Sequence, residues 1–181
     1  INKKTGEREG GVFNKGFLTS CVGYVPFDGN DKYLVYTHGQ QKAVDNYKGI
    51  YNDYMFDSLK CNSKITGEVL WQHFIGETYA EPLLDGNQVF CGNHAGDFRC
   101  IDVKTGELLW EVHTEYPISV APTTDPENSY ISNDKGELFA FNRNTGLEVW
   151  KVSIPKEYNA FQQCSRAVNF GNNILIGSAN K

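Results

Sequence analysis

One segment of this chain recurs three times, and the constant interval between its copies limits the fold more than any other feature. All three copies end in Thr-Gly-x-x-x-Trp, and they span residues 63–71, 102–110 and 142–150. The glycine of this ending recurs after 39 residues (67 to 106) and again after 40 (106 to 146). A fixed period of about 40 residues is typical of a chain built from copies of one small unit. A degenerate fourth copy, Asn-Lys-Lys-Thr-Gly-Glu, opens the chain at residue 2.

Each copy contains four short apolar runs separated by turn residues. In the best-preserved copy the predicted strands cover residues 79–84, 88–92, 97–102 and 107–113. Runs of β-branched and aromatic residues bounded by Gly, Asn and Asp are strand and hairpin signals. Several runs, such as residues 138–141, are apolar at successive positions, which indicates strands covered on both faces. The sequence therefore predicts an all-β fold of four-stranded antiparallel blades stacked face to face, a β-propeller with about four blades present and no long helix outside one insertion.

The repeated Asn/Asp-x-x-Thr-Gly element predicts a tight turn. The side chain of Asp102 or Asn142 can accept a hydrogen bond from the backbone two residues on, and the glycine tolerates a positive φ. Ser63 replaces the Asn or Asp in one copy and can accept the same bond more weakly.

The segment Asp-Val-Lys-Thr-Gly-Glu-Leu-Leu-Trp at 102–110 resembles the tryptophan-docking motif of the PQQ-like, or quinoprotein-type, propeller repeats. The resemblance covers nearly the whole chain, 1–181, and is greatest to the non-enzymatic scaffolds of the outer-membrane assembly lipoprotein type. In that family the tryptophan packs between adjacent blades. The resemblance therefore implies structural roles for two sets of residues, Trp71, Trp110 and Trp150 and Gly67, Gly106 and Gly146.

Four blades are fewer than the seven or eight that are usual in this family. Both ends of the chain fall inside a blade by the repeat pattern, which favours a partial ring completed by further sequence or by further copies of the chain. A complete four-bladed protein is the alternative.

The net charge of the chain argues against two classes of partner. A net charge of −5 without a run of Lys or Arg argues against nucleic acid and anionic membrane as partners. No apolar stretch approaches the roughly 18 residues of a membrane-spanning helix.

The five cysteines show no Cys-x-x-Cys spacing. Counting back from the turn at 94–95 pairs Cys91 with Phe98, so Cys100 is diagonal to Cys91, and buried free thiols are expected.

The sequence offers no residues for catalysis, for a cofactor or for a metal. Quinoprotein enzymes of the family have adjacent cysteines, a tryptophan on the quinone and calcium ligands, whereas here no cysteines are adjacent and all three tryptophans belong to the repeat. The acidic stretch 28–31 resembles a calcium loop, but it falls where other repeats have a hairpin turn. The four histidines, His38, His73, His94 and His113, show neither ligand spacing nor a Ser or Cys partner.

One segment breaks the period, because the first interval between Thr-Gly glycines exceeds one repeat. The excess lies at residues 40–57, within the first blade, where Val44, Tyr47, Tyr51 and Tyr54 follow near-helical spacing. These residues predict one face of two or three helical turns. The insertion either packs on its own blade or projects as a partner-binding element.

Strand direction alternates within a blade, so the longer connections between blades share one face with the turn between the second and third strands. We predict a partner site on that face, because recognition residues concentrate on loops held by a rigid scaffold and exposed tyrosines favour recognition. The candidate residues are Tyr47, Tyr51, Tyr54, Glu77, Tyr79, His94, Glu115, Tyr116, Glu157 and Tyr158.

These residues favour a non-enzymatic scaffold that binds a protein or peptide. Two alternatives remain: a fragment of a PQQ-dependent dehydrogenase that oxidises alcohols or sugars, and an extracellular polysaccharide-binding module. The family resemblance implies a periplasmic, cell-surface or secreted location.

Overall fold

A computed structural model describes residues 4, 27–43, 52–153 and 165–177, and every regular element in these residues is a β-strand. Three four-stranded antiparallel sheets and one strand pair follow one another along the chain. Blade 1 consists of β1 (Phe27–Gly29), β2 (Tyr33–Ala43), β3 (Asn52–Ser63) and β4 (Val69–Thr78). Blade 2 consists of β5 (Leu83–Asp85), β6 (Gln88–Gly92), β7 (Asp97–Asp102) and β8 (Leu108–His113). Blade 3 consists of β9 (Thr123–Thr124), β10 (Asn128–Ser132), β11 (Glu137–Asn142) and β12 (Glu148–Ser153). The last pair is β13 (Val168–Phe170) and β14 (Asn173–Leu175).

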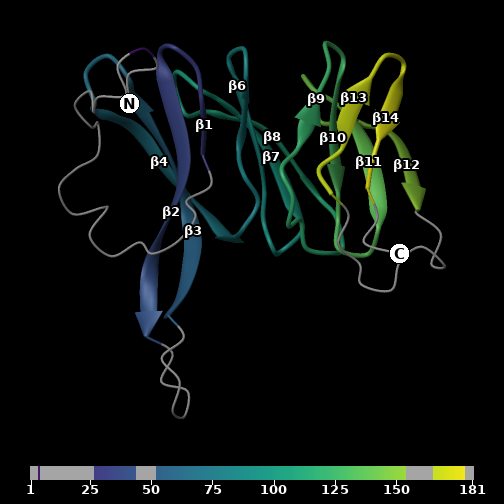
Figure 1. The fold of residues 1–181 in the computed structure, drawn as a ribbon, viewed down its shortest axis with the longest axis horizontal. Helices are drawn as coiled ribbons and strands as arrows, with labels where there is room; N and C mark the ends of the chain where they lie inside the picture. The colour runs from purple at the N-terminus through teal and green to yellow at the C-terminus, as the bar shows by residue number, and fades with distance from the viewer. Residues whose placement is uncertain (1–3, 5–26, 44–51, 154–164, 178–181) are drawn as a thin grey trace.

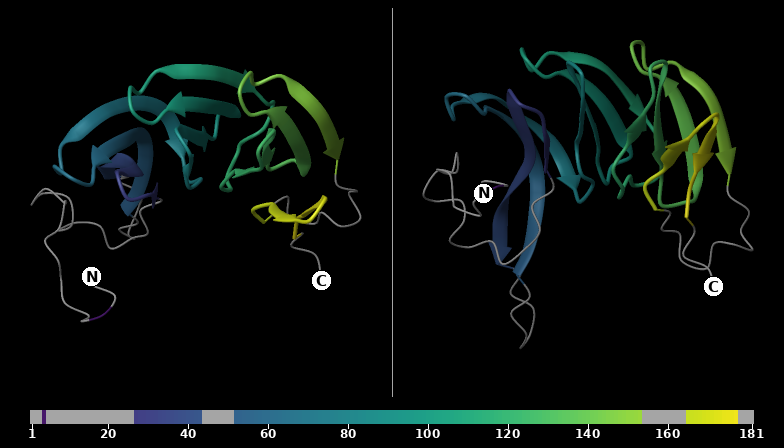
Figure 2. Two further views of the ribbon diagram at one scale, coloured as in Figure 1. Left: turned by 90° about the horizontal axis from the view of Figure 1, so that it is seen from above. Right: turned by 45° about the horizontal axis from the view of Figure 1, so that its top comes forward.

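The blades stand side by side along an open arc, as the view from above in Figure 2 shows. Within each complete blade the strands are hydrogen-bonded in chain order (Figure 1). The first strands of neighbouring blades contact one another, β1 with β5 and β9 with β13. The fourth strands, β4, β8 and β12, therefore lie at the opposite edges of their blades. This arrangement is a partial β-propeller and confirms the predicted fold class.

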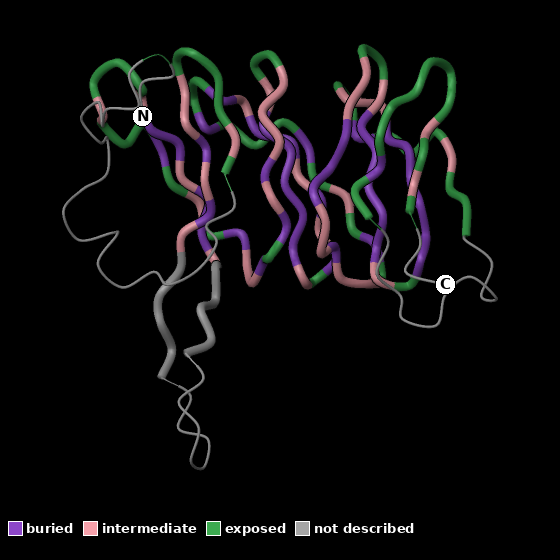
Figure 3. Tube along the Cα trace, viewed as in Figure 1, coloured by how far each residue is buried: buried purple, intermediate pink, exposed green. Residues whose placement is uncertain are grey.

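Two hydrophobic layers fill the spaces between the blades, and buried segments occupy the middle of each blade in Figure 3. Between blades 1 and 2 the buried side chains include Val35, Leu59, Val89 and Cys91. Between blades 2 and 3 they are mainly aromatic: Phe90, Phe98, Trp110, Phe139 and Phe141. Since successive residues of β6 enter different layers, the middle strands are apolar on both faces, as the sequence predicted.

The tryptophans join each blade to the next. The indole nitrogen of Trp71 donates to the carbonyl of Val103 at 2.7 Å, and that of Trp110 donates to the carbonyl of Arg143 at 2.9 Å. Both rings are 8% exposed. Each ring covers the glycine of the following Thr-Gly turn so closely that a Cβ on Gly106 would lie 2.7 Å from the Trp71 ring. The repeat motif therefore places Trp71 and Trp110 each on the turn of the next blade.

The Asn/Asp-x-x-Thr-Gly turns have the predicted hydrogen bonds. Asp102 Oδ1 accepts from the backbone nitrogens of Lys104 at 2.9 Å and Thr105 at 2.8 Å. The backbone nitrogen of Gly106 closes the turn on the carbonyl of Asp102 at 2.8 Å, with a φ of 76°. Because that φ disfavours residues with a Cβ, the turn and the docked ring both require glycine at this position.

Trp150 differs from the other two tryptophans. It is only half-buried, and its ring contacts Tyr130 with 5.9 Å between centroids. It lies opposite Ala140, as Trp110 lies opposite Cys100, so the two tryptophans hold equivalent positions in their blades. Among the described residues Trp150 is therefore less buried than Trp71 and Trp110.

The strand register corrects one expectation about the cysteines. Cys91 lies opposite Arg99, and Phe90 lies opposite Cys100, so Cys91 does not pair with Phe98. The turn between β6 and β7 is longer than the two-residue hairpin assumed in the count, which shifts the pairing by one position. Cys91 and Cys100 enter different hydrophobic layers, and they are buried free thiols together with Cys61.

The insertion at 40–57 also differs from its prediction. Its described ends continue β2 and β3, which stay paired as far as Ala43 and Asn52. Tyr54 therefore lies in a strand, opposite Gln41, and not in a helical turn. Extending an existing antiparallel ladder supplies backbone hydrogen bonds to both arms, and Tyr54, Met55 and Phe56 suit a strand. Val44, Tyr47 and Tyr51 lie outside the described residues.

The first strand of blade 2 is shorter than predicted. Residues 79–82 form the connection from blade 1, and β5 begins only at Leu83. Pro82 has no backbone N–H to donate to a ladder, and the Ala80 nitrogen bonds the Thr78 hydroxyl at 3.1 Å instead. Tyr79 therefore lies in the connecting segment and not in the sheet.

Candidate partner-binding face

Two sets of connections lie at opposite ends of the blades. The turns between first and second and between third and fourth strands, such as 85–88 and 102–107, lie at the upper end in Figure 1. The turns between second and third strands lie at the lower end with the connections between blades. We call this lower end the loop face, and its described parts are residues 77–82, 93–96, 114–119 and 133–136. The paired ends of β2 and β3, up to Ala43 and Asn52, extend beyond the other blades on the same side (Figure 1).

The segments of the loop face are held in place by buried polar groups. The hydroxyl of Thr78 donates to the carbonyl of Gly92 at 2.8 Å, which fixes the end of β4 against β6. The backbone nitrogen of His94 donates to the carbonyl of Glu77 at 2.7 Å. One repeat later the nitrogen of Asp134 bonds the carbonyl of Pro117 at 2.8 Å. The same kind of backbone bond thus joins the β6–β7 turn and the β10–β11 turn to the segment that leads into their blade.

Glu77, Tyr79 and His94 form one side-chain cluster on this face. The Tyr79 hydroxyl donates to Glu77 Oε1 at 3.2 Å, and His94 Nδ1 lies 3.8 Å from the same oxygen. The rings of Tyr79 and His94 contact each other with 4.7 Å between centroids. Tyr79 remains 43% exposed. Three residues selected from the sequence as separate candidates are therefore neighbours in space.

His94 has a serine partner, contrary to the sequence prediction. Ser119 Oγ lies 3.4 Å from His94 Nε2 and donates a hydrogen bond to Asp134 Oδ2 at 2.9 Å. Ser119 comes from the connection between blades 2 and 3, so sequence spacing gave no indication of this contact. The cluster is thereby extended from blade 1 to the β10–β11 turn of blade 3.

Tyr116 and Glu115 lie on the neighbouring part of the loop face. The ammonium group of Lys135 sits 4.5 Å from the centre of the Tyr116 ring, a cation–π contact. Tyr116 is half-buried, whereas Glu115 is exposed. Glu157 and Tyr158 lie outside the described residues, as do Tyr47 and Tyr51, and Tyr54 is placed only by its strand.

A buried carboxylate lies under this part of the loop face. Glu137 accepts a hydrogen bond from Asn133 Nδ2 at 2.8 Å and forms ion pairs with Lys151 at 3.0 Å and Lys135 at 3.5 Å. Burial alone would raise the pKa of the Glu137 carboxyl, but the hydrogen bonds from Asn133 and Lys151 and the two lysine charges outweigh it and lower the pKa below its usual range.

The variant Glu137→Gln is expected to reduce the acid sensitivity of the fold. Because the folded-state pKa of Glu137 lies below the unfolded value of about 4.3, its carboxylate stabilises the fold above that value. That contribution is lost as the pH falls through the folded pKa. Urea unfolding measured from about pH 6 to pH 3 should therefore show a smaller loss of stability in Glu137→Gln than in the parent. Glu148→Gln, at an exposed position, is the control and should follow the parent. An equal loss of stability with falling pH in all three proteins would contradict the lowered pKa of Glu137.

The other candidates from the sequence form hydrogen bonds with neighbouring groups of the fold. The stretch 28–31 covers the end of β1 and the start of the β1–β2 turn. In this turn Asn30 Oδ1 accepts from the nitrogens of Lys32 at 2.9 Å and Tyr33 at 3.0 Å. His113 bonds Asp97 at 2.9 Å, and His73 contacts the carbonyl of Gly106 at 2.7 Å. Among the described residues no three His, Cys, Asp or Glu side chains form a group suited to a metal ion. No helix in the same part of the chain has the length and apolar character needed to cross a membrane.

The repeated docking motif and the blades agree with a known family. A family model described as outer membrane protein assembly factor BamB matches residues 56–181, which is more than half of the chain. The chain belongs to this family. The match runs from the middle of β3 to the end of the sequence and includes all three Thr-Gly-x-x-x-Trp copies.

Two curated relatives have other names. The chain is 30% identical over 107 residues to a tetrathionate hydrolase of Acidithiobacillus ferrooxidans, an alignment with 58% of this chain and 21% of that protein. It is 35% identical over 79 residues to a quinoprotein ethanol dehydrogenase of Pseudomonas putida, with 42% of this chain and 12% of that protein. The chain thus spans less than a quarter of the length of either relative.

A solved structure shows the same fold. BamB from Moraxella catarrhalis superposes with a TM-score of 0.62 at 16% identity, over 85% of this chain and 42% of that one. At this identity the likeness shows the fold alone.

Proposed function

We propose that this chain is part of a non-enzymatic propeller scaffold that binds a protein or peptide partner on its loop face. The observation that supports this proposal most is the cluster of Glu77, Tyr79 and His94. The end of β4, the connection after it and the β6–β7 turn build this cluster together. An exposed tyrosine offers a large apolar surface with a polar tip and few rotamers to order on binding. The family description, an outer membrane protein assembly factor, is consistent with a role in binding other proteins.

The charges of the loop face favour a basic partner. Four acidic residues lie on its described segments, against one lysine, Lys135, whose ammonium is engaged with Tyr116 and Glu137. They are Glu77, Glu81, Glu115 and Asp134. An excess of negative potential speeds the association of a positively charged partner and disfavours an acidic one. The projecting β2–β3 hairpin would enlarge the contact surface on the same side. By its family we place the protein outside the cytoplasm. Further copies of the chain, or further blades, would complete the ring.

The substitution Tyr79→Ala is expected to weaken partner binding about tenfold or more, because exposed aromatic anchors contribute most to small interfaces. A partner protein recovered by chemical cross-linking would be purified and titrated calorimetrically against each variant. Leu108→Ala, which removes a side chain of similar exposure at the opposite end of blade 2, is the matched control. Unchanged affinity with a lowered unfolding midpoint in Tyr79→Ala would show that the tyrosine is a packing residue and that the site lies elsewhere.

The likeness to a quinoprotein ethanol dehydrogenase supports a second candidate, a part of a PQQ-dependent dehydrogenase. The two candidates differ in a direct assay. Adding pyrroloquinoline quinone, calcium and ethanol to the chain should leave an electron-accepting dye oxidised if the protein is a scaffold. Dye reduction that depends on both the quinone and ethanol would overturn the scaffold proposal.

A further inference from the structure

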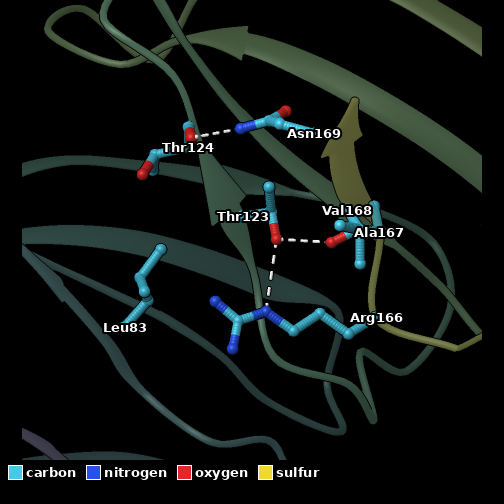
Figure 4. A pocket seen from close by; sticks show the side chains of 7 residues that line it. All are labelled: Leu83, Thr123, Thr124, Arg166, Ala167, Val168 and Asn169. Atoms are coloured by element: carbon cyan, nitrogen blue, oxygen red, sulfur yellow. Dashed lines mark hydrogen bonds between the residues drawn. The ribbon is translucent and has the colours of Figure 1, made fainter. Parts of the chain in front are cut away.

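A pocket lies between the first strands of the blades, at the inner edge of the arc. It has a volume of ≈ 420 Å³ and is lined by Leu83 of β5, the two threonines of β9 and residues 166–169 at the start of β13. Three consecutive blades thus contribute to one cavity (Figure 4). Pockets that hold small ligands begin at about 300 Å³, so this cavity is large enough for a small organic molecule or the end of a peptide.

Arg166 is an exposed residue that lines this pocket, and a hydrogen bond holds its guanidinium. Its Nε donates to Thr123 Oγ1 at 3.2 Å, and Thr123 in turn donates to the carbonyl of Ala167 at 2.6 Å. Thr123 is buried, so the anchor of the guanidinium is part of the packed structure. Figure 4 shows the terminal nitrogens of Arg166 directed across the pocket toward Leu83. The edge of the guanidinium that can bind a planar anion with two parallel hydrogen bonds therefore faces the cavity.

Arg166 differs from the other described arginines in its charge partners. Arg99 is paired with Asp97 and Glu111, and Arg143 is paired with Asp85 at 2.8 Å. Within the described ranges no carboxylate lies at ion-pair distance from Arg166. A guanidinium fixed by a neutral hydroxyl, without an opposing charge among these residues, is suited to accept a charge from a ligand.

The remaining polar groups of the pocket are already engaged. The hydroxyl of Thr124 donates to Asp85 Oδ2 at 2.9 Å, and Asn169 Nδ2 donates to the carbonyl of Thr124 at 2.6 Å. Asp85, the acidic residue nearest in this network, is itself neutralised by Arg143. The other walls are apolar and come from Leu83, Ala167 and Val168.

We propose that this pocket binds a carboxylate that carries a short aliphatic body, with the carboxylate on the terminal nitrogens of Arg166 and the aliphatic part against Leu83 and Val168. One guanidinium matches the single charge and the planar shape of a carboxylate. A phosphate dianion would have a second charge without a second cation in the described part of the site. The carboxylate comes either from a small molecule or from the C-terminus of a polypeptide.

Calorimetric titration of the full 181-residue chain tests this site. The probes are butanoate and its uncharged amide, and an N-acetylated pentapeptide that ends in Leu-Leu with either a free or an amidated C-terminus. We expect saturable binding of at least one free carboxylate and binding about tenfold weaker for the matching amide, because hydrogen bonds between charged groups are lost. Binding of butanoate would identify a small-molecule site, and binding of the peptide acid alone would identify a C-terminus.

The variant Arg166→Gln should lose the preference for the free acid, whereas Lys104→Gln, which removes an exposed positive charge from the β7–β8 turn, should retain it. Arg166→Lys keeps the charge without the two-pronged edge and should bind with intermediate strength, which provides a second test if Arg166→Gln does not fold. Equal binding of acid and amide, equal losses in Arg166→Gln and Lys104→Gln, or tighter binding of inorganic phosphate than of butanoate would each overturn the proposal. Absence of binding by all carboxylate probes would also overturn it.

Discussion

Replacing Trp110 with alanine is expected to lower the free energy of unfolding by about 3–5 kcal/mol, the usual range for deleting a buried large aromatic side chain. The ring is 8% exposed and contacts Phe90 and Phe98 at centroid distances of 6.0 and 5.3 Å. Its indole also bonds the carbonyl of Arg143 in blade 3 at 2.9 Å. The substitution would therefore leave a cavity between two blades and an unpaired carbonyl beside it. Urea unfolding followed by circular dichroism measures the change.

Trp150→Ala is the matched control for this experiment, because it deletes the same side chain at the equivalent position of the next repeat. Trp150 is half-buried, so its loss should destabilise the fold by clearly less than that of Trp110. Trp110→Phe should fall between the two, since it restores part of the volume without the hydrogen bond. Equal losses for Trp110→Ala and Trp150→Ala would contradict the different roles assigned to the two residues.

Replacing Gly106 with alanine is expected to destabilise the fold by about 3 kcal/mol through two separate effects. A residue with a Cβ pays about 1–2 kcal/mol in the left-handed conformation, and Gly106 has a φ of 76°. The added Cβ would also lie 2.7 Å from the Trp71 ring, and overpacking of this kind adds about 1–3 kcal/mol.

Gly86→Ala separates the two effects in the same blade. Gly86 has a φ of 62°, but a Cβ there would meet no atom within 4 Å. Its substitution should therefore show the conformational strain alone, about 1–2 kcal/mol. The free energies of unfolding of the two alanine variants should therefore differ by the energy of the close contact between the added Cβ and Trp71. If the two variants lose the same stability, Trp71 does not rest on Gly106.

The parts of the fold that follow from local sequence were predictable. The Thr-Gly-x-x-x-Trp repeat marks the turn and the fourth strand of each blade, because both depend on residues close together in the chain. The two-sided apolar runs predicted burial on both faces, which the mixed layers around Phe90 and Cys91 confirm.

Features that depend on pairing between distant residues were not predictable in the same way. The register of β6 and β7 depends on the length of the turn at 93–96. An error of one residue there made the prediction place Cys91 opposite Phe98, whereas it lies opposite Arg99. The spacing of tyrosines in 40–57 suggested a helix, but the existing β2–β3 ladder extends into its ends. Tertiary pairing thus outweighed local periodicity in this segment.

The candidate site shows the same division. Topology alone placed Glu77, Tyr79 and His94 on one face, and the structure brings these three residues into contact. The contact of His94 with Ser119 and the orientation of Arg166 on Thr123 come from segments in different blades. No spacing in a single sequence reports such contacts, because they depend on how one blade is rotated against the next.

The docking of Trp71 and Trp110 on the next blade joins neighbouring blades, together with the buried layers between them. A double-mutant cycle that combines Trp71→Ala with Gly106→Ala measures this contact most directly. In the Trp71→Ala background the added methyl group meets space in place of a ring, so Gly106→Ala should cost only about 1–2 kcal/mol of backbone strain. The two losses would then be less than additive by about 1–3 kcal/mol. Losses that add fully would show that Trp71 and Gly106 do not touch in solution and would contradict the blade-to-blade docking.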